Sequence, residues 1–113
     1  KDFAVRIVKL YKYLTEEKKE FILSKQVFRS GTSIGANIAE AMRAESLADF
    51  VHKLYIAYKE AGETLYWIEI ANRGEYLDEI QTQSLHIDCE ELIKMLTSII
   101  KTSKNKLNNK PKN

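Results

Sequence analysis

Residues 28–41 read FRSGTSIGANIAEA, and the interpretation of this stretch decides the fold expected for the whole chain. Gly31 and Gly35 stand there among small hydroxyl, amide and alanine side chains. Such a composition suggests a phosphate-binding loop, but that loop requires GxxxxGK[ST] after an apolar strand. Gly35 is followed by Ala36 and Asn37, and no lysine lies between residues 26 and 52. The glycine pair therefore predicts a helix that another helix approaches closely, since two glycines inside a helix need a compensating contact.

Apolar residues recur at helical spacing in four segments, which predicts four amphipathic helices joined by short connections. These helices are expected over about residues 2–14, 20–44 and 47–73, and from residue 78 or 84 to residue 102. Their core stripes are Phe3, Ile7, Leu10 and Leu14; Val27, Gly31, Ile34, Ile38 and Ala41; Leu47, Phe50, Leu54, Tyr58, Ala61, Leu65 and Ile68; and Leu85, Cys89, Leu92, Leu96 and Ile99. Thr15 starts the first connection or caps the second helix, Ser46 caps the third, and Gly74 ends it. The expected fold is an all-α, antiparallel up-and-down four-helix bundle over residues 1–102.

The third helix carries more apolar surface than a lone bundle needs. Ile56, Trp67 and Ile70 lie about 140–200° from its core stripe, with Tyr66 nearby. A contiguous exposed patch that contains a tryptophan indicates a partner, so we expect a homo-oligomer. The alternative is that Trp67 belongs to the core of the bundle.

Charge is distributed unevenly along a chain whose net charge is only +2. Residues 60–93 hold nine acidic residues and a single base, Arg73. Residues 103–113 form a polar segment that we expect to be disordered. The last thirteen residues contain no acid and five lysines: Lys101, Lys104, Lys106, Lys110 and Lys112. Such a lysine run binds RNA or DNA through counterion release, or serves only as a solubilising tail.

Candidate chemistry elsewhere is weak. Asp49 and His52, or His86 and Cys89, have the spacing of a pair of metal ligands, but further ligands have no obvious source. Glu40 and Glu63 are candidates for paired acids, although a polar seam between helices explains them equally well, and Lys59 with Glu63 predicts an ordinary helix salt bridge. We therefore expect no catalytic residue, no metal and no cofactor. The lone cysteine suits a reducing cytoplasm, and neither a signal segment nor a membrane span is expected.

The stretches LYKYLTEEKKEFILSKQVFRSGTSIGANIAEA and DFVHKLYIAYKEAGETLYWIEIA resemble the bacterial four-helix bundle protein family, also called 23S rRNA intervening-sequence proteins. The resemblance covers about residues 3–102. It implies an up-and-down bundle that assembles into a homopentamer, has no known enzymatic activity and has no established biochemical role, although some members carry a ribosomal-protein label. A related pentameric bundle is the basic, nucleic-acid-binding accessory protein of diversity-generating retroelements. The body of this chain is acidic, which weakens a transfer of that role.

The family signature maps onto two of the predicted helices. It comprises Arg29, Ser30, Ser33, Gly35, Asn37 and Glu40 in the second helix, and Lys59, Glu63, Thr64, Tyr66 and Trp67 in the third. Arg29, Ser33, Asn37 and Glu40 also form a polar line on the side of the second helix away from its core stripe. We expect these polar residues to pair with neighbouring helices, across subunits. The function expected is a non-enzymatic oligomeric scaffold that binds RNA or DNA weakly. The alternative is a protein–protein interaction module that binds no nucleic acid.

Overall fold

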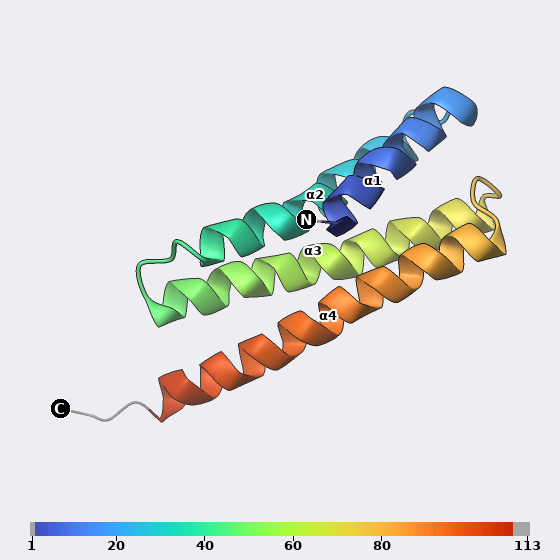
Figure 1. Ribbon diagram of the computed structural model, residues 1–113. Helices are drawn as coiled ribbons and strands as arrows, with labels where there is room; N and C mark the ends of the chain where they lie inside the picture. Colours follow the sequence, from blue (N-terminus) through green and yellow to red (C-terminus); the bar gives the residue numbers. More distant parts are fainter. Residues whose placement is uncertain (1, 110–113) are drawn as a thin grey trace.

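The computed structural model describes residues 2–109, and over this range the protein is all-α, with no strand among these residues. Its elements are α1 (Asp2–Lys12), the π-helical segment η1 (Tyr13–Glu17), α2 (Leu23–Ala41), α3 (Leu47–Arg73) and α4 (Glu79–Asn108). The molecule is long and thin, with extents of 60 × 22 × 20 Å. α3 is the central element, because α2 packs along one side of it and α4 along another, while α1 lies on α2 (Figure 1). The prediction of four helices is confirmed.

The first helix is longer than predicted. The stripe Phe3, Ile7, Leu10 and Leu14 is buried, as expected. Helical structure continues through Glu17, beyond the predicted end at residue 14, because η1 extends α1 by one wide turn. Two residues after this turn, the chain changes direction at Lys19, whose φ of 53° lies in the left-handed region. Thr15 does not cap α2, since its hydroxyl donates to the Tyr11 carbonyl within the first helix.

A carboxylate, rather than a hydroxyl, organises the start of α2. Glu20 accepts hydrogen bonds from the backbone N–H groups of Ile22, Leu23 and Ser24 at 3.0, 2.8 and 2.6 Å. These donors have no partner inside the helix, and a negative charge is favourable at a helix N-terminus. The helix then runs to Ala41 and contains the whole of the stretch 28–41. That stretch is therefore not a phosphate loop.

α3 begins and ends where the sequence predicted. The Ser46 hydroxyl accepts from the Asp49 N–H at 3.0 Å, and Gly74 is the C-cap residue. The left-handed residue of this turn is Glu75, with a φ of 68°, whereas Gly74 has a φ of −80°. Within the predicted core stripe, Leu54, Ala61 and Ile68 are buried, but Leu47 and Tyr58 are exposed, so the prediction was wrong for these two.

α4 begins at the earlier of the two predicted positions and ends later than predicted. Asp78 and Gln81 form a reciprocal capping box, which fixes the start. Leu85, Cys89 and Leu96 are buried, but farther along Ile100 is buried in place of the exposed Ile99. The helix passes the predicted end at Thr102 and continues to Asn108. The prediction of a disordered tail from residue 103 was therefore wrong for residues 103–108, and residues 110–113 lie outside the described part of the chain.

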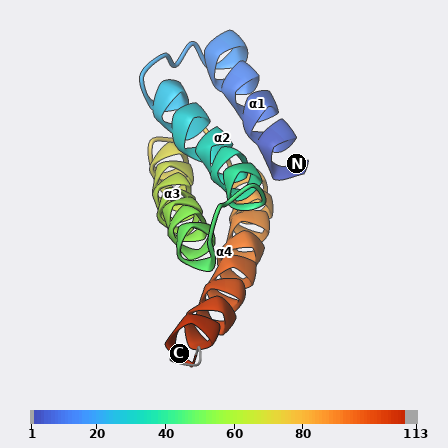
Figure 2. The same ribbon diagram turned by 90° about the vertical axis from the view of Figure 1, so that its left-hand side faces the viewer.

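The two halves of the molecule differ because α1 is short (Figure 2). At the closed end, α1 lies over the first half of α2 and reaches α4, where Arg6 pairs with Asp88 at 2.6 Å. At the open end, which comprises residues 35–58 and 92–108, no fourth helix of the described residues lies over α2, α3 and α4. Trp67 and Ile70 are half-buried and pack against the core, which corrects the prediction that they form an exposed patch.

Candidate functional site

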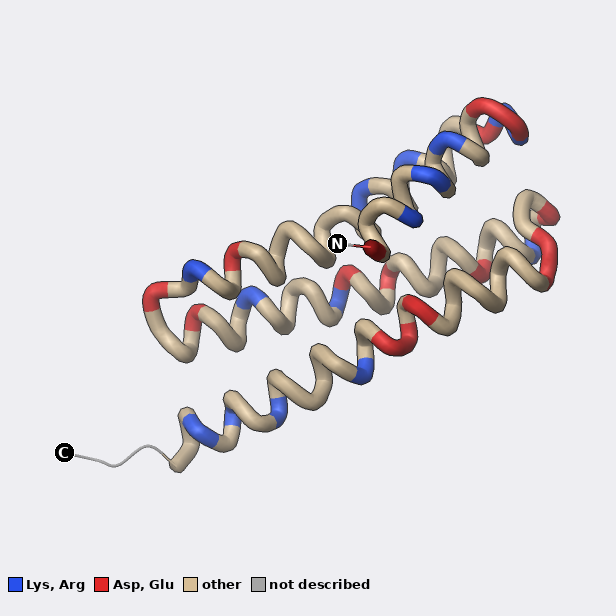
Figure 3. The backbone as a smooth tube through the Cα atoms, in the orientation of Figure 1, with Lys and Arg blue, Asp and Glu red and all other residues tan. Residues whose placement is uncertain are grey.

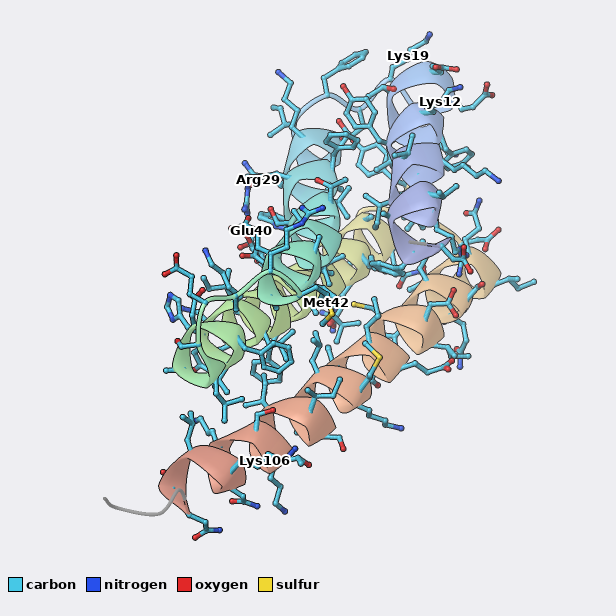
Figure 4. The ribbon with its side chains drawn as sticks, turned by 60° about the vertical axis from the view of Figure 1, so that its left-hand side comes forward. Lys12, Lys19, Arg29, Glu40, Met42 and Lys106 are labelled. Atoms are coloured by element: carbon cyan, nitrogen blue, oxygen red, sulfur yellow. The ribbon has the colours of Figure 1, made fainter. Side chains whose placement is uncertain are left out.

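A polar seam joins α2 to α3, formed by four residues of the predicted signature together with Glu60 and Lys53. Arg29 pairs with Glu63, and its other nitrogen lies 3.3 Å from a Glu60 oxygen. The Trp67 indole N–H donates to the same Glu63 carboxylate at 3.0 Å. Figure 4 shows Arg29 and Glu40 along α2. The seam therefore fixes α2 against α3 within one chain.

Glu40 closes the other end of this polar seam. It lies 3.0 Å from the Lys53 ammonium, and this hydrogen bond together with the charge of Glu40 raises the pKa of Lys53. Glu40 and Glu63 thus have separate cationic partners. Of the two interpretations drawn from the sequence, this arrangement favours a polar seam between helices over a pair of acids that act together.

Next to this seam, the contact between α2 and α3 is fully buried. Thr64 donates to the Ser30 hydroxyl at 2.9 Å, and both side chains are fully buried. Asn37 instead donates to the Ser33 carbonyl of its own helix. Arg29, Ser30 and Glu40 therefore do pair with a neighbouring helix, and that helix belongs to the same chain. Pairing across subunits stays a prediction.

Lys59 and Tyr66 do not take part in the polar seam. The sequence predicted a salt bridge between Lys59 and Glu63. In the structure Glu63 pairs with Arg29 instead. The Lys59 ammonium lies instead 5.9 Å from the centre of the Tyr55 ring. Tyr66 is exposed and meets the Trp67 ring edge-on at 5.0 Å.

The glycine pair divides between the two ends of the molecule. A Cβ atom on Gly31 would lie 2.7–2.9 Å from three atoms of Ile7, so this glycine does let α1 approach closely. A Cβ atom on Gly35 would meet nothing within 4 Å. The prediction of a close helix contact is therefore confirmed at Gly31, whereas the part of the chain that the structure describes supplies no such contact at Gly35.

The open end presents apolar side chains where a covering helix is missing. Met42 is 67% exposed, and Leu47, Met95 and Ile99 are exposed as well. A groove of about 440 Å³ runs between α3 and α4 there, lined by Leu47, Phe50, Ser98, Ile99, Thr102, Ser103 and Lys106. We call this surface the open apolar face.

Opposite charges separate along α4 (Figure 3). Its first half carries Asp88, Glu90 and Glu91, and its second half carries Lys94, Lys101, Lys104 and Lys106 with no acidic residue after Glu91. Lys106 lies near the end of α4, far from Lys12 and Lys19 at the opposite end of the molecule (Figure 4). Lys110 and Lys112 lie outside the described residues. Three of the five predicted lysines are thus held on one rigid helix.

Sequence reasoning missed two aromatic residues beside these lysines. Tyr55 and Tyr58 of α3 lie in a shared groove with Lys101 and Lys104 of α4. The lysine segment itself contains no aromatic residue, so only the packing of α3 on α4 brings the two types together. The position of Tyr55 outside the predicted stripe is a signal that could have identified it, whereas the spacing of Tyr58 placed that residue in the core.

Cys89 is a buried thiol and does not belong to a reactive pair. Its sulfur contacts the Ala61 carbonyl at 3.3 Å, and burial, with a smaller effect of Glu90, raises its pKa to about 12. His86 lies 3.6 Å from Glu90. Within residues 2–109, no three His, Cys, Asp or Glu side chains come close enough together to hold a metal ion. No helix in this range is both long and apolar enough to cross a membrane.

Proteins similar to this chain are found among family models and among solved structures. The model of the family described as 23S rRNA-intervening sequence protein matches residues 1–98. A crystal structure from Bacteroides thetaiotaomicron, of a protein with unknown function from the S23 ribosomal protein family, is 59% identical and superposes with a TM-score of 0.88. The alignment covers 88% of this chain and 93% of that one. The curated proteins contain no significant match.

Proposed function

This chain belongs to the 23S rRNA-intervening sequence protein family, and from that premise we propose that it is a non-enzymatic, self-associating scaffold that binds RNA or DNA as polyanions. The second half of α4 is the binding element of this proposal. The observation that carries the proposal is the charge separation along α4, which leaves lysines without acidic neighbours on one end of a rigid rod.

Counterion release explains why such an end binds nucleic acid. Lys101, Lys104 and Lys106 occupy the last turns of a continuous helix, so their charges move together as one unit. Each phosphate that a lysine neutralises releases condensed cations from the nucleic acid, and this gain does not depend on base sequence. The binding proposed is therefore nonspecific and strongly weakened by salt.

Self-association is supported by the open apolar face. Met42, Leu47 and Ile99 lie where α1 is too short to cover α2, α3 and α4. Burying such residues stabilises an interface by roughly 25 cal/mol per Å² before the costs of association. The family resemblance supports an antiparallel up-and-down bundle as the subunit and a homopentamer as the assembly. The pairings of Arg29 with Glu63 and of Glu40 with Lys53 agree with antiparallel helices, because residue numbers fall along α3 as they rise along α2.

The test must keep α4 intact, because deleting residues 103–113 would remove helical turns. Fluorescence anisotropy with a structured rRNA fragment and a random duplex DNA would compare the wild type with a triple Lys101→Gln, Lys104→Gln, Lys106→Gln variant. A matched control carries Lys9→Gln, Lys12→Gln and Lys18→Gln at the closed end. Measurements at about 50 and 200 mM salt should show binding that collapses with salt, and a shallower salt dependence in the first variant only. Equal effects of the two triple variants would contradict the assignment to α4.

A protein partner on the open apolar face is the second candidate function. The exposed apolar groove along α3 and α4 favours it, because such a groove suits an amphipathic helix. Sedimentation velocity of the purified protein separates the two cases. A stable oligomer means that the face is covered by copies of this chain. A monomer that binds no nucleic acid leaves the face to a different protein.

A further inference from the structure

A groove of about 300 Å³ lies between α3 and α4 on the opposite flank from the open apolar face. Tyr55 and Phe50, which line the two grooves, are about 140° apart around α3. The second groove is lined by Tyr55, Tyr58, Thr97, Ile100, Lys101 and Lys104. We call it the tyrosine–lysine groove. A partner on the open apolar face would not need to cover it.

Two tyrosine rings form the floor of this groove. The rings of Tyr55 and Tyr58 are nearly parallel, with centroids 5.9 Å apart and an interplanar angle of 22°. Tyr55 is 46% exposed and Tyr58 is 37% exposed, so ring surface remains accessible. Because the rings stack on each other, the surface open to another π-system is the exposed outer part of this aromatic pair.

Cations border the same platform. The ammonium groups of Lys59 and Lys104 each lie 5.9 Å from the centre of the Tyr55 ring, and Lys101 lines the groove beside them. No acidic side chain lines the groove. The site therefore combines stacking surface with positive charge, without a carboxylate that would repel a phosphate.

We propose that the tyrosine–lysine groove binds single-stranded nucleic acid, with bases stacked on Tyr55 and Tyr58 and phosphates held by Lys59, Lys101 and Lys104. This inference rests on the proposed binding of nucleic acid and specifies its form. Single-strand binding proteins combine the same two elements, a positive groove and aromatic side chains under successive bases. A duplex cannot use the platform, because its bases are already paired and stacked on one another.

The groove predicts little base discrimination. Its lining contains no Asn, Gln or Arg side chain that could form paired hydrogen bonds with a base edge, and every base has a face that stacks. The preference is therefore for strandedness and not for sequence.

Fluorescence anisotropy on the full chain tests this proposal. The probes are a labelled oligouridylate of about 12 nucleotides, which has little structure of its own, and a labelled RNA duplex of equal length, each at about 100 mM salt. The variants are Tyr55→Leu, which removes the stacking ring, and Tyr55→Phe, which keeps it. Tyr66→Leu is the matched control, an exposed tyrosine of the same helix outside the groove. Circular dichroism melting verifies that each variant is folded.

The wild type should bind the single strand more tightly than the duplex. Tyr55→Leu should weaken single-strand binding about tenfold, the loss expected for one stacked base, and leave duplex binding unchanged. Tyr55→Phe and Tyr66→Leu should bind like the wild type. Equal affinity for the two probes, or a single-strand affinity that Tyr55→Leu does not change, overturns the groove while leaving polyanion binding in place. If the protein binds neither probe, both the groove proposal and the proposal of polyanion binding are overturned.

Discussion

The closed and open ends of this molecule are built from the same three long helices and differ in whether a fourth element lies over them. Gly31 and Gly35 show the difference most clearly, since they stand one turn apart on α2. Three atoms of Ile7 fill the space where a Gly31 side chain would be, and nothing fills the corresponding space at Gly35. Glycine thus allows α1 to approach α2 closely at one end, whereas the space beside the glycine at the other end is empty.

This comparison teaches that the surface available for function follows from the length of α1. Where α1 ends, core-type residues such as Met42 and Ile99 become surface, and the end of α4 carries its lysines away from the acidic first half of that helix. The closed end holds the fold together, and the open end carries the surfaces to which we assign binding.

The largest expected effect comes from truncating one isoleucine at each end. Ile7→Ala should destabilise the fold by about 2–5 kcal/mol, because Ile7 is completely buried and its loss leaves a cavity. In protein dilute enough to be monomeric, Ile99→Ala should cost far less, since Ile99 is partly exposed to water in the single chain. Urea denaturation monitored by circular dichroism measures both. Similar losses for the two variants would mean that another chain buries the open apolar face, and sedimentation at two concentrations would then reveal it.

The second largest effect is expected in the pH dependence of stability, through the buried thiol of Cys89 at the closed end. Cys89 has a pKa raised to about 12 from an ordinary value of 9.0, so the folded chain keeps a proton that the unfolded chain releases. Its contribution to stability is complete below pH 9 and is lost as the pH rises towards 12, by about 1.4 kcal/mol per pH unit. Cys89→Ala should remove this part of the alkaline slope in a denaturation series.

The same cysteine provides a kinetic test. At pH 8 a disulfide reagent should modify wild-type Cys89 only as fast as the closed end opens. In a Cys89→Ala, Ile99→Cys double variant, the new thiol lies at the open end and should react at once when the protein is dilute enough to be monomeric. Rapid modification of the wild type would contradict this expectation, because it would show that Cys89 is readily accessible to the reagent in the folded protein.

Alanine substitutions at the two glycines should have effects of opposite sign. Gly31→Ala adds a methyl group into Ile7, and overpacking of about 1–3 kcal/mol exceeds the gain in helix propensity. Gly35→Ala should stabilise the fold by up to about 1 kcal/mol, because alanine favours a helix and the site has room. Thermal melts of the two variants test this directly. A destabilised Gly35→Ala protein would place a helix of another subunit against Gly35.

The smallest effect is expected in the polar seam. Glu63→Gln should cost about 0.2–1 kcal/mol, because the ion pair with Arg29 is partly exposed and the amide still accepts from the Trp67 indole. Trp67 fluorescence should shift little in the folded state. A loss above about 2 kcal/mol would indicate that the polar seam is buried in an assembly.

Most of the helical layout could be predicted, because the signals are local. Ser46 and Asp78 mark the starts of α3 and α4 through hydrogen bonds to nearby N–H groups, and such bonds depend only on adjacent residues. The end of α4 was missed although a signal existed. Leu96, Ile100, Ser103 and Leu107 recur at helical spacing and pack towards the core, but their polar, lysine-rich context favoured disorder.

The candidate site was less predictable, because it depends on contacts between distant segments. The lysines of α4 were identified from composition, whereas Tyr55 and Tyr58 were counted with α3 alone. Only the packing of α3 on α4 places the two groups in one groove. Leu47 and Tyr58 were expected in the core but are exposed, because their burial also depends on how α3 packs against its neighbours.

The sequence by itself determined the all-α class, the number of helices and the Ser46 cap of α3, since apolar periodicity and capping act over one or two turns. It also determined that lysines gather at one end and acids before them. Tertiary structure decided which glycine is covered, whether Trp67 is core or surface, and which tyrosines meet which lysines. The first outcome depends on how far α1 extends over its neighbours, and the last depends on how α3 packs on α4. No local pattern along the chain encodes either arrangement.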